Sequence, residues 1–278
     1  MKILIIPDVH GCNAWEDNVK NNIDNVDKVV FLGDYFDSFN IQEKGLFALD
    51  NFNKIIELKK NNKDKVDVLL GNHDVENYLA GTRCSGYQES MFLQYNEVLL
   101  KYLDLFDIGV TYDGWTFSHA GYSSSWVAWA MECLKINYPS LLDICYENGE
   151  LNPVSFSNKL LHNTDYRLLV YNYLDVSGYG DNKLQTPLWI RPDALIKNMF
   201  YEKQVVGHSE SLIKDPRFYT AKQDWYGEDP KWEYNKLIVL DSPGHDQYFI
   251  LDTEKIDYHF ETILTYKRRE KQLMKGSI

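Results

Sequence analysis

The chain has 278 residues, of which 44% are hydrophobic, and this combination is sufficient for one large domain and excludes extensive disorder. Its formal net charge of -12 and its pI of about 5.0 disfavour DNA or RNA as an obligate partner, because an acidic surface repels polyanions. No apolar stretch is long enough to span a membrane, and the four cysteines show no pairing motif, so we predict a cytoplasmic protein without membrane contact.

The first quarter of the chain alternates between predicted strands and predicted helices. Short apolar runs predict buried strands at residues 2–7, 28–32 and 66–70. Helical segments are predicted between them, at residues 13–21 and 44–60. Each strand ends in a polar cluster, a pattern typical of α/β layers whose chemistry lies beyond the carboxyl ends of the strands.

The middle of the chain begins with a predicted helix and a predicted hairpin. Residues 88–106 have helical composition, and residues 108–111 and 115–118 flank the turn Asp113-Gly114 as two short strands. From residue 123 to residue 191 the chain is rich in aromatic and turn residues. We predict a single domain over residues 1–278, in which a helical, aromatic cap or insertion of about residues 123–200 shapes the substrate cleft.

Aromatic side chains within the predicted cap recur at helical spacing. Trp126, Trp129, Ala130 and Cys133 would share one face of a helix. We interpret this face as buried core rather than as a cofactor site, because apolar stripes of this kind usually pack inward.

The last third of the chain returns to strands. Apolar runs predict strands at residues 204–206, 236–240 and 248–251, and we expect the last two to pair as a hairpin. The basic tail, residues 267–275, is interpreted as a solvated helix end rather than as a nucleic-acid contact.

Five polar clusters, each directly after a strand-like run, carry the chemistry predicted for this chain. They are Asp8-Val9-His10-Gly11, Gly33-Asp34-Tyr35-Phe36-Asp37, Gly71-Asn72-His73-Asp74, Ser118-His119-Ala120-Gly121 and Val206-Gly207-His208. Carboxylate, imidazole and amide groups bind divalent cations of intermediate hardness, whereas the absence of cysteine from the clusters excludes a closed thiolate zinc site. Such ligands on one rim can hold two cations about 4 Å apart, which bind phosphate and activate the attacking water.

These motifs resemble the calcineurin-like metallophosphoesterase superfamily, whose pattern is D-x-H, G-D-x-x-D, G-N-H-D/E, a later His and G-H. Within it, the chain most resembles bacterial and bacteriophage members of the phosphoprotein (serine/threonine) phosphatase family. Gly11 follows the first motif, Gly121 ends a His-Ala-Gly, the last motif reads Gly-His-Ser-Glu, and residues 188–192 resemble a Trp-x-Arg segment. The resemblance implies an α/β (α+β) fold: a four-layer β-sandwich flanked by helices.

The resemblance also implies roles for individual residues. Six metal ligands are implied: Asp8, His10, Asp34, Asn72, His119 and His208. The first two would bind one ion, the last three a second ion, and Asp34 would bridge both. His73 would be the general acid that protonates the leaving oxygen, and Asp37 would orient it.

One departure from the family concerns the substrate phosphate. The protein phosphatases usually continue the second motif as Gly-Asp-x-Val-Asp-Arg-Gly, but here Asp37 is followed by Ser38 and no arginine. Arg191 is the first candidate to bind the phosphate instead, and Arg83 is the second. This departure weighs against ordinary phosphoserine or phosphothreonine specificity.

The predicted function is hydrolysis of phosphate monoesters by in-line attack of a hydroxide bound to two metal ions. The substrate would be a phosphoprotein or a small phosphoester, and manganese is favoured over iron, zinc and magnesium. The alternative is a dinucleoside polyphosphate or cyclic-nucleotide hydrolase on the same metal site, with aromatic residues of the cap stacking a base. A scaffold without activity is disfavoured, because every ligand position is filled.

Overall fold

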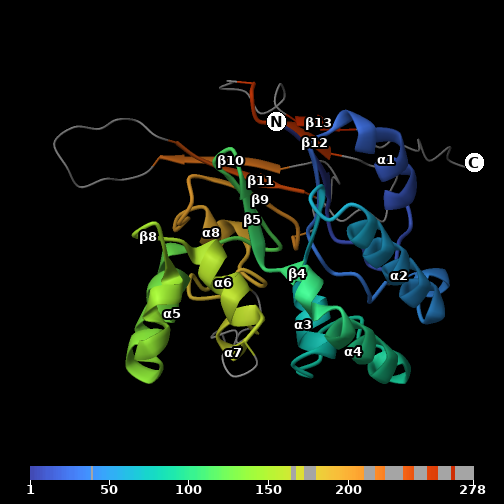
Figure 1. Cartoon of the computed structure of the whole chain (residues 1–278), viewed down its shortest axis with the longest axis horizontal. Coiled ribbons are helices and arrows are strands. Elements are labelled where there is room, and N and C mark those ends of the chain that lie inside the picture. Colours follow the sequence, from blue (N-terminus) through green and yellow to red (C-terminus); the bar gives the residue numbers. More distant parts are fainter. Residues whose placement is uncertain are drawn as a thin grey trace, which may run out of the picture.

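Two β-sheets and their flanking helices make up the fold (Figure 1), and the computed structural model describes residues 1–38, 40–163, 167–171, 180–209, 217–222, 234–240, 249–255 and 264–266. The first sheet contains β1 (Lys2–Ile6), β2 (Lys28–Phe31), β3 (Val66–Leu69), β4 (Phe106–Asp107), β12 (Phe249–Asp252) and β13 (Leu264–Tyr266). The second contains β5 (Gly109–Tyr112), β6 (Trp115–Ser118), β9 (Lys203–Val206), β10 (Arg217–Lys222) and β11 (Tyr234–Val239). A small ribbon joins β7 (Tyr146–Glu147) to β8 (Glu150–Leu151).

Parallel pairing places the motif-bearing ends of the strands together. The first sheet has the order β13-β12-β1-β2-β3-β4, and β1, β2, β3 and β4 run parallel. The second has the order β10-β11-β9-β6-β5, in which β6, β9 and β11 run parallel. Because parallel neighbours end at the same edge, each sheet presents its polar clusters on one side.

Alternating side chains of the strands build two different cores. Ile3 and Ile5 pack between the sheets with Phe117 and Val205, whereas Leu4 of the same strand packs under the helices. This period of two is the spacing of a strand that is buried on both faces. Each such aliphatic side chain contributes about 1.5–3 kcal/mol when it leaves water.

Helices cover the outer faces of both sheets. They are α1 (Trp15–Asn22), α2 (Leu46–Asn61), α3 (Asn72–Tyr78), α4 (Phe92–Lys101), α5 (Ser124–Asn137), α6 (Pro153–Leu161), α7 (Leu168–Tyr171) and α8 (Pro192–Leu195). Figure 1 shows α2, α3 and α4 on one side of the molecule and α5, α6 and α7 on the other. Buried residues of α1, α2, α4, α5 and α6 share one core cluster with the first sheet, and α8 packs against β9 and β11 of the second; two sheets flanked by helices confirm the predicted fold class.

The predicted cap region is helical where it is described. Ser123 caps α5 by accepting a hydrogen bond from the Trp126 amide at 3.1 Å, and Asn152 caps α6 in the same way. Trp126 and Ala130 of the predicted face are fully buried, but Trp129 and Cys133 are only partly buried, because the buried face of α5 is turned toward Val127 and Leu134. That residues 123–200 act as a cap over a cleft stays a prediction.

Two details of the predicted secondary structure were wrong. The strand at residues 249–252 does not pair with β11 as a hairpin; it pairs antiparallel with β1 in the other sheet. The reason is that β11 already has hydrogen-bonded neighbours on both edges, β9 and β10. The predicted helix 88–106 is α4 between two 3-10 turns, because Phe106 joins the first sheet through β3.

The basic tail at residues 267–275 lies outside the described residues. Among the residues that are described, no helix is long and apolar enough to cross a membrane.

Candidate active site

Polar residues from both sheets converge where the parallel strands end. Asp8, Asp34 and Asn72 follow β1, β2 and β3 of the first sheet, and His119 and His208 follow β6 and β9 of the second. All five are buried or nearly so. The turn after each strand therefore delivers one polar side chain to a common site.

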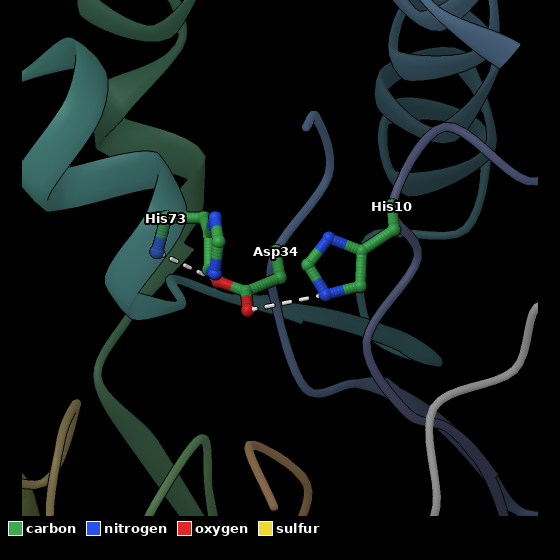
Figure 2. A group of neighbouring side chains, drawn as sticks. All are labelled: His10, Asp34 and His73. Carbon is green, nitrogen blue, oxygen red and sulfur yellow. Dashed lines mark hydrogen bonds and ion pairs between the residues drawn. The ribbon is translucent and has the colours of Figure 1, made fainter. Parts of the chain in front are cut away.

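Asp34 lies at the centre of this site. Its Oδ2 is 3.7 Å from His10 Nε2 and 3.5 Å from His119 Nε2. Its Oδ1 accepts a hydrogen bond from the backbone N–H of His73 at 2.9 Å. Figure 2 shows Asp34 between His10 and His73, with both contacts drawn. One carboxylate thus links three of the polar clusters, the position that the resemblance implies for a bridging ligand.

A second convergence point is the side-chain oxygen of Asn72. This Oδ1 lies 2.8 Å from His119 Nε2 and 2.9 Å from His208 Nδ1. Asp8 completes the group, since its Oδ1 is 3.8 Å from His119 Nδ1. Two overlapping sets of donors, His10–Asp34–His73 and Asp8–Asp34–His119, each lie within 4.8 Å and could hold an ion.

Backbone carbonyls decide which imidazole nitrogens carry protons. His119 Nδ1 lies 2.9 Å from the carbonyl oxygen of Leu32, and His10 Nδ1 lies 3.1 Å from that of Phe36. A carbonyl oxygen only accepts, so each Nδ1 donates and each neutral ring keeps a lone pair on Nε2. These two lone pairs face the oxygens of Asn72 and Asp34 with no proton between them, an arrangement that suits a cation.

The third imidazole of the ligand set, that of His208, differs, because no second hydrogen bond among the described residues fixes its tautomer. His208 directs Nδ1 at Asn72, and its Nε2 is buried without a hydrogen-bond partner among the described residues. Burial lowers the pKa of His208 well below its usual value and also lowers the pKa of His10. Both rings are therefore neutral at pH 7, the form in which imidazole binds a metal.

The two central carboxylates differ in their electrostatics. Burial raises the pKa of Asp8 above its ordinary value. Burial alone would do the same at Asp34, but the surrounding histidines, His119 first, outweigh it and lower the pKa of Asp34. Asp34 therefore stays ionised, as a ligand shared between two cations needs to be.

Two glycines make room for these carboxylates. A Cβ at Gly71 would lie 2.1 Å from Asp34 Oδ1, and a Cβ at Gly207 would lie 2.1 Å from Asp8 Oδ1. Neither glycine has a positive φ, so space rather than backbone conformation requires glycine there.

His73 and Asp37 form a pair beside the proposed ligands. His73 Nδ1 lies 3.2 Å from Oδ2 of Asp37, whose side chain is fully buried. Burial opposes the imidazolium form of His73, but Asp34 and then Asp37 outweigh it and raise its pKa well above the usual range. The protonated ring is the form that a general acid needs.

Comparison with known families identifies the chain. Residues 1–271 match the family of calcineurin-like phosphoesterases. The chain belongs to this family. It is therefore a hydrolase of phosphate esters, and its substrates are phosphorylated compounds.

Solved structures resemble the phosphoesterase in fold. A cold-active protein-tyrosine phosphatase of the psychrophile Shewanella sp. is 16% identical and has a TM-score of 0.50, covering 90% of this chain and 75% of its own. A serine/threonine phosphatase from Saccharomyces cerevisiae is 13% identical over 96% of this chain and 79% of its own, with a TM-score of 0.49. At 16% identity, the likeness to the Shewanella enzyme concerns the fold alone. No curated protein matches this chain in sequence.

The two candidate arginines of the phosphoesterase lie in different surroundings. Arg191 is close enough to His208 to help lower its pKa, and the ring of Trp189 lies 5.5 Å from the His208 ring. Arg83 instead lies 3.5 Å from the carboxylate of Glu89, with its side chain 58% exposed. The structure therefore brings Arg191 to the candidate site, whereas the guanidinium of Arg83 pairs on the surface.

The sequence did not predict the residues that hold the turns of the phosphoesterase in place. The buried carboxylate of Asp74 accepts hydrogen bonds from the backbone N–H groups of Asp34, Tyr35 and Gly71, at 2.8, 2.8 and 2.9 Å. Gln204, fully buried in β9, hydrogen-bonds the backbone of Tyr122 at 2.8 and 3.0 Å. The available signals were the acidic end of the third motif and a polar residue inside an apolar strand.

Proposed function

We propose that this phosphoesterase hydrolyses phosphate monoesters in the manner of serine/threonine protein phosphatases, with two divalent metal ions as cofactors. The observation that carries the proposal is the set of imidazole lone pairs directed at Asp34 and Asn72, next to the His73–Asp37 pair. A ligand set for cations and a protonated acid on one rim are the two components that phosphate ester hydrolysis requires.

The proposed ligands divide between two ions. Asp8 and His10 serve the first ion, Asp34 serves both, and the second ion takes the donors around Asn72. Those donors are Asn72 Oδ1, His119 Nε2 and His208 Nδ1. When bound, such ions supply Lewis acidity toward water and phosphate oxygens. We propose manganese as the metal, with iron, zinc or magnesium as alternatives, because mixed oxygen and nitrogen ligands accept all four.

Side chains of the protein would protonate the leaving group and bind the phosphate oxygens. Water attacks phosphorus in line with the scissile P–O bond, and His73 gives its proton to the departing oxygen while Asp37 holds the ring. No covalent phosphoenzyme forms. Arg191 binds the phosphate oxygens in place of the arginine that is missing after Asp37, through its planar fork of donors.

Most of the large aromatic rings in and next to the predicted cap that would be needed to stack a base belong to the core. Tyr122, Trp126 and Phe156 are fully buried in the core, where Trp126 stacks on Phe156 at 5.7 Å between ring centroids. These rings are therefore not available to stack a base, whereas Trp189, which is partly buried, lies 5.5 Å from the His208 ring, and the assays below distinguish the two substrates.

The first experiment is hydrolysis of p-nitrophenyl phosphate by metal-stripped protein, with and without added Mn²⁺, followed by Fe²⁺ and Zn²⁺. We expect turnover only with metal. Parallel assays with bis-p-nitrophenyl phosphate and diadenosine tetraphosphate separate the alternatives, because a monoesterase cleaves neither efficiently. Turnover of the dinucleotide alone would replace the monoester assignment, and turnover that survives chelation would contradict the metal-dependent reaction.

A further inference from the structure

Three side chains of one short helix donate to a single buried carboxylate. The carboxylate is that of Asp37, which has no exposed surface. Its Oδ2 lies 3.2 Å from Nδ1 of His73 and also accepts a hydrogen bond from the amide Nδ2 of Asn77. Its Oδ1 accepts a hydrogen bond from the hydroxyl of Tyr78, and all three partners belong to α3. Both oxygens of Asp37 are thus occupied, and only one of them faces the imidazole.

These contacts matter because a buried carboxylate needs hydrogen-bond donors. An isolated carboxylate in an apolar interior would take up a proton or rotate toward other donors. Asn77 and Tyr78 supply one donor to each carboxyl oxygen of Asp37 and so fix the rotation of its carboxyl group. The oxygen that meets His73 Nδ1 is thereby held in one place.

The two donors are themselves held in position. Asn77 Oδ1 accepts a hydrogen bond from the backbone N–H of Cys84 at 2.6 Å, which assigns its Nδ2 to Asp37. The Tyr78 hydroxyl accepts one from the backbone N–H of Gln88 at 3.2 Å and so directs its own proton to Asp37. Both side chains are fully buried. The loop after α3 therefore fixes both donors from behind.

We infer that Asn77 and Tyr78 are positioning residues, which hold the carboxyl group of Asp37 in one orientation so that His73 is aligned to protonate the leaving oxygen. They touch neither substrate nor metal and act only through Asp37. The inference rests on the proposed function, because it needs His73 as the general acid.

The test compares two phosphate esters that differ in their need for an acid. Nitrophenolate is a stable leaving group that departs without a proton, whereas phenolate departs slowly unless it is protonated. For Tyr78→Phe and for Asn77→Ala we expect kcat on phenyl phosphate to fall about tenfold, which is the usual loss for a residue that orients a functional side chain. On p-nitrophenyl phosphate we expect kcat to fall about twofold or less. KM and the bound manganese should be unchanged.

The matched control is Tyr95→Phe. Tyr95 is a fully buried tyrosine of the same aromatic cluster, 5.0 Å from the Tyr78 ring, but its hydroxyl donates to the carbonyl of Gly45 at 2.8 Å. Its loss should leave the ratio of the two esters unchanged. Thermal melting of every variant shows that it is folded, and Asn77→Ala tests the inference independently if Tyr78→Phe is unstable.

The outcomes distinguish a failure of the positioning role from a failure of the proposed function. If the unaltered enzyme turns over both esters and the Tyr78 and Asn77 variants lose both rates equally, or neither, the positioning role is wrong while the proposed function stands. If the unaltered enzyme cleaves neither ester with any of the metals, the proposed function is wrong and the inference with it.

Discussion

Single residues at the site have unusual backbone conformations. His10, Asp34, Asp37 and His208 all have positive φ, at 44°, 54°, 64° and 60°. Left-handed backbone costs a non-glycine residue about 1–3 kcal/mol and persists where the surrounding structure enforces it. Four such residues in one site mean that the folded protein tolerates backbone strain there in order to orient particular side chains. Replacing those side chains should therefore affect function more than folding.

The first prediction at this scale concerns His73. We expect His73→Asn to bind metal normally and to lose about 10²–10⁴-fold in turnover of phenyl phosphate, the contribution typical of a general acid. Steady-state kinetics and metal analysis of the same preparation provide the measurement. His162→Asn is the matched control, because His162 lies against Asp107 rather than in the site. A variant that lost one metal ion would instead make His73 a ligand of the His10–Asp34 set.

The second prediction concerns the pH dependence of stability. Burial raises the pKa of Glu76 on α3 from 4.5 to about 7 in the folded protein, where the Thr82 hydroxyl also contacts its carboxyl. The folded state thus favours protonated Glu76, and this contribution is complete below pH 4.5 and lost as the pH rises through 7. Glu76→Gln should therefore be more stable than the unaltered protein by about 2 kcal/mol at pH 8.5.

Urea unfolding at two pH values measures this difference. The gain from Glu76→Gln should shrink strongly at pH 5, where the native carboxyl is already protonated. Glu97→Gln, on the exposed face of α4, should change stability equally at both values. A gain for Glu76→Gln that did not depend on pH would show that the carboxyl does not titrate in this range.

At the scale of elements, the junction between strand and turn is what positions the ligands. Asp8 follows β1 and Gly207 follows β9, which belong to different sheets, yet Gly207 lies directly against the carboxylate of Asp8. The backbone N–H of His208 also donates to Asp8, at 3.0 Å to Oδ2. The ends of the two sheets are therefore in contact through the carboxylate of Asp8. This carboxylate leaves space for the hydrogen of Gly207 but not for the methyl group of an alanine.

Gly207→Ala tests this close approach. The added Cβ would lie 2.1 Å from Asp8 Oδ1, so Asp8 must move away from its proposed ion. We expect manganese affinity, measured by titration calorimetry, to fall about 10–100-fold. The control is Gly114→Ala in the β5–β6 turn, where the Cβ meets nothing, although the φ of +76° will cost some stability. Equal affinities for the two variants would contradict the proposed place of Asp8.

At the scale of the whole molecule, the proposed ligands come from both halves of the sandwich. Asp8, Asp34 and Asn72 belong to the first sheet, and His119 and His208 to the second. Cations held between them would link the two sheets at the edge where several carboxylate and imidazole groups are buried. Metal binding should therefore stabilise the entire domain and not only the local turns.

Calorimetric melting with chelator and with excess manganese measures this linkage. At a hundredfold excess over Kd each site adds about 2.7 kcal/mol. For a domain of this size we expect Tm to rise by about 5–10 °C. Asp34→Asn should abolish most of the rise, since Asp34 is proposed to serve both ions, whereas Asp24→Asn, on the 3-10 turn after α1, should not change it. An equal rise in both variants would contradict the shared ligand.

The sequence by itself determined most of the strands and the positions of the polar clusters. Apolar runs such as residues 28–32 and 66–70 predicted β2 and β3 because burial and period are local properties. Parallel strands with a polar residue after each one also implied that Asp34 and Asn72 would meet at one edge. The family resemblance then supplied the roles that local pattern alone does not contain.

Only the tertiary structure decided which distant segments meet. It placed residues 249–252 beside β1 rather than β11, because a strand joins whichever edge is free and that depends on the whole sheet. It placed Arg191 near His208 and Arg83 beside Glu89 on the surface, although the sequence offered both arginines as candidates to bind the phosphate. It also brought Tyr78 to Asp37, since a contact across about 40 residues has no local signal and arises only when the helix packs against the turn.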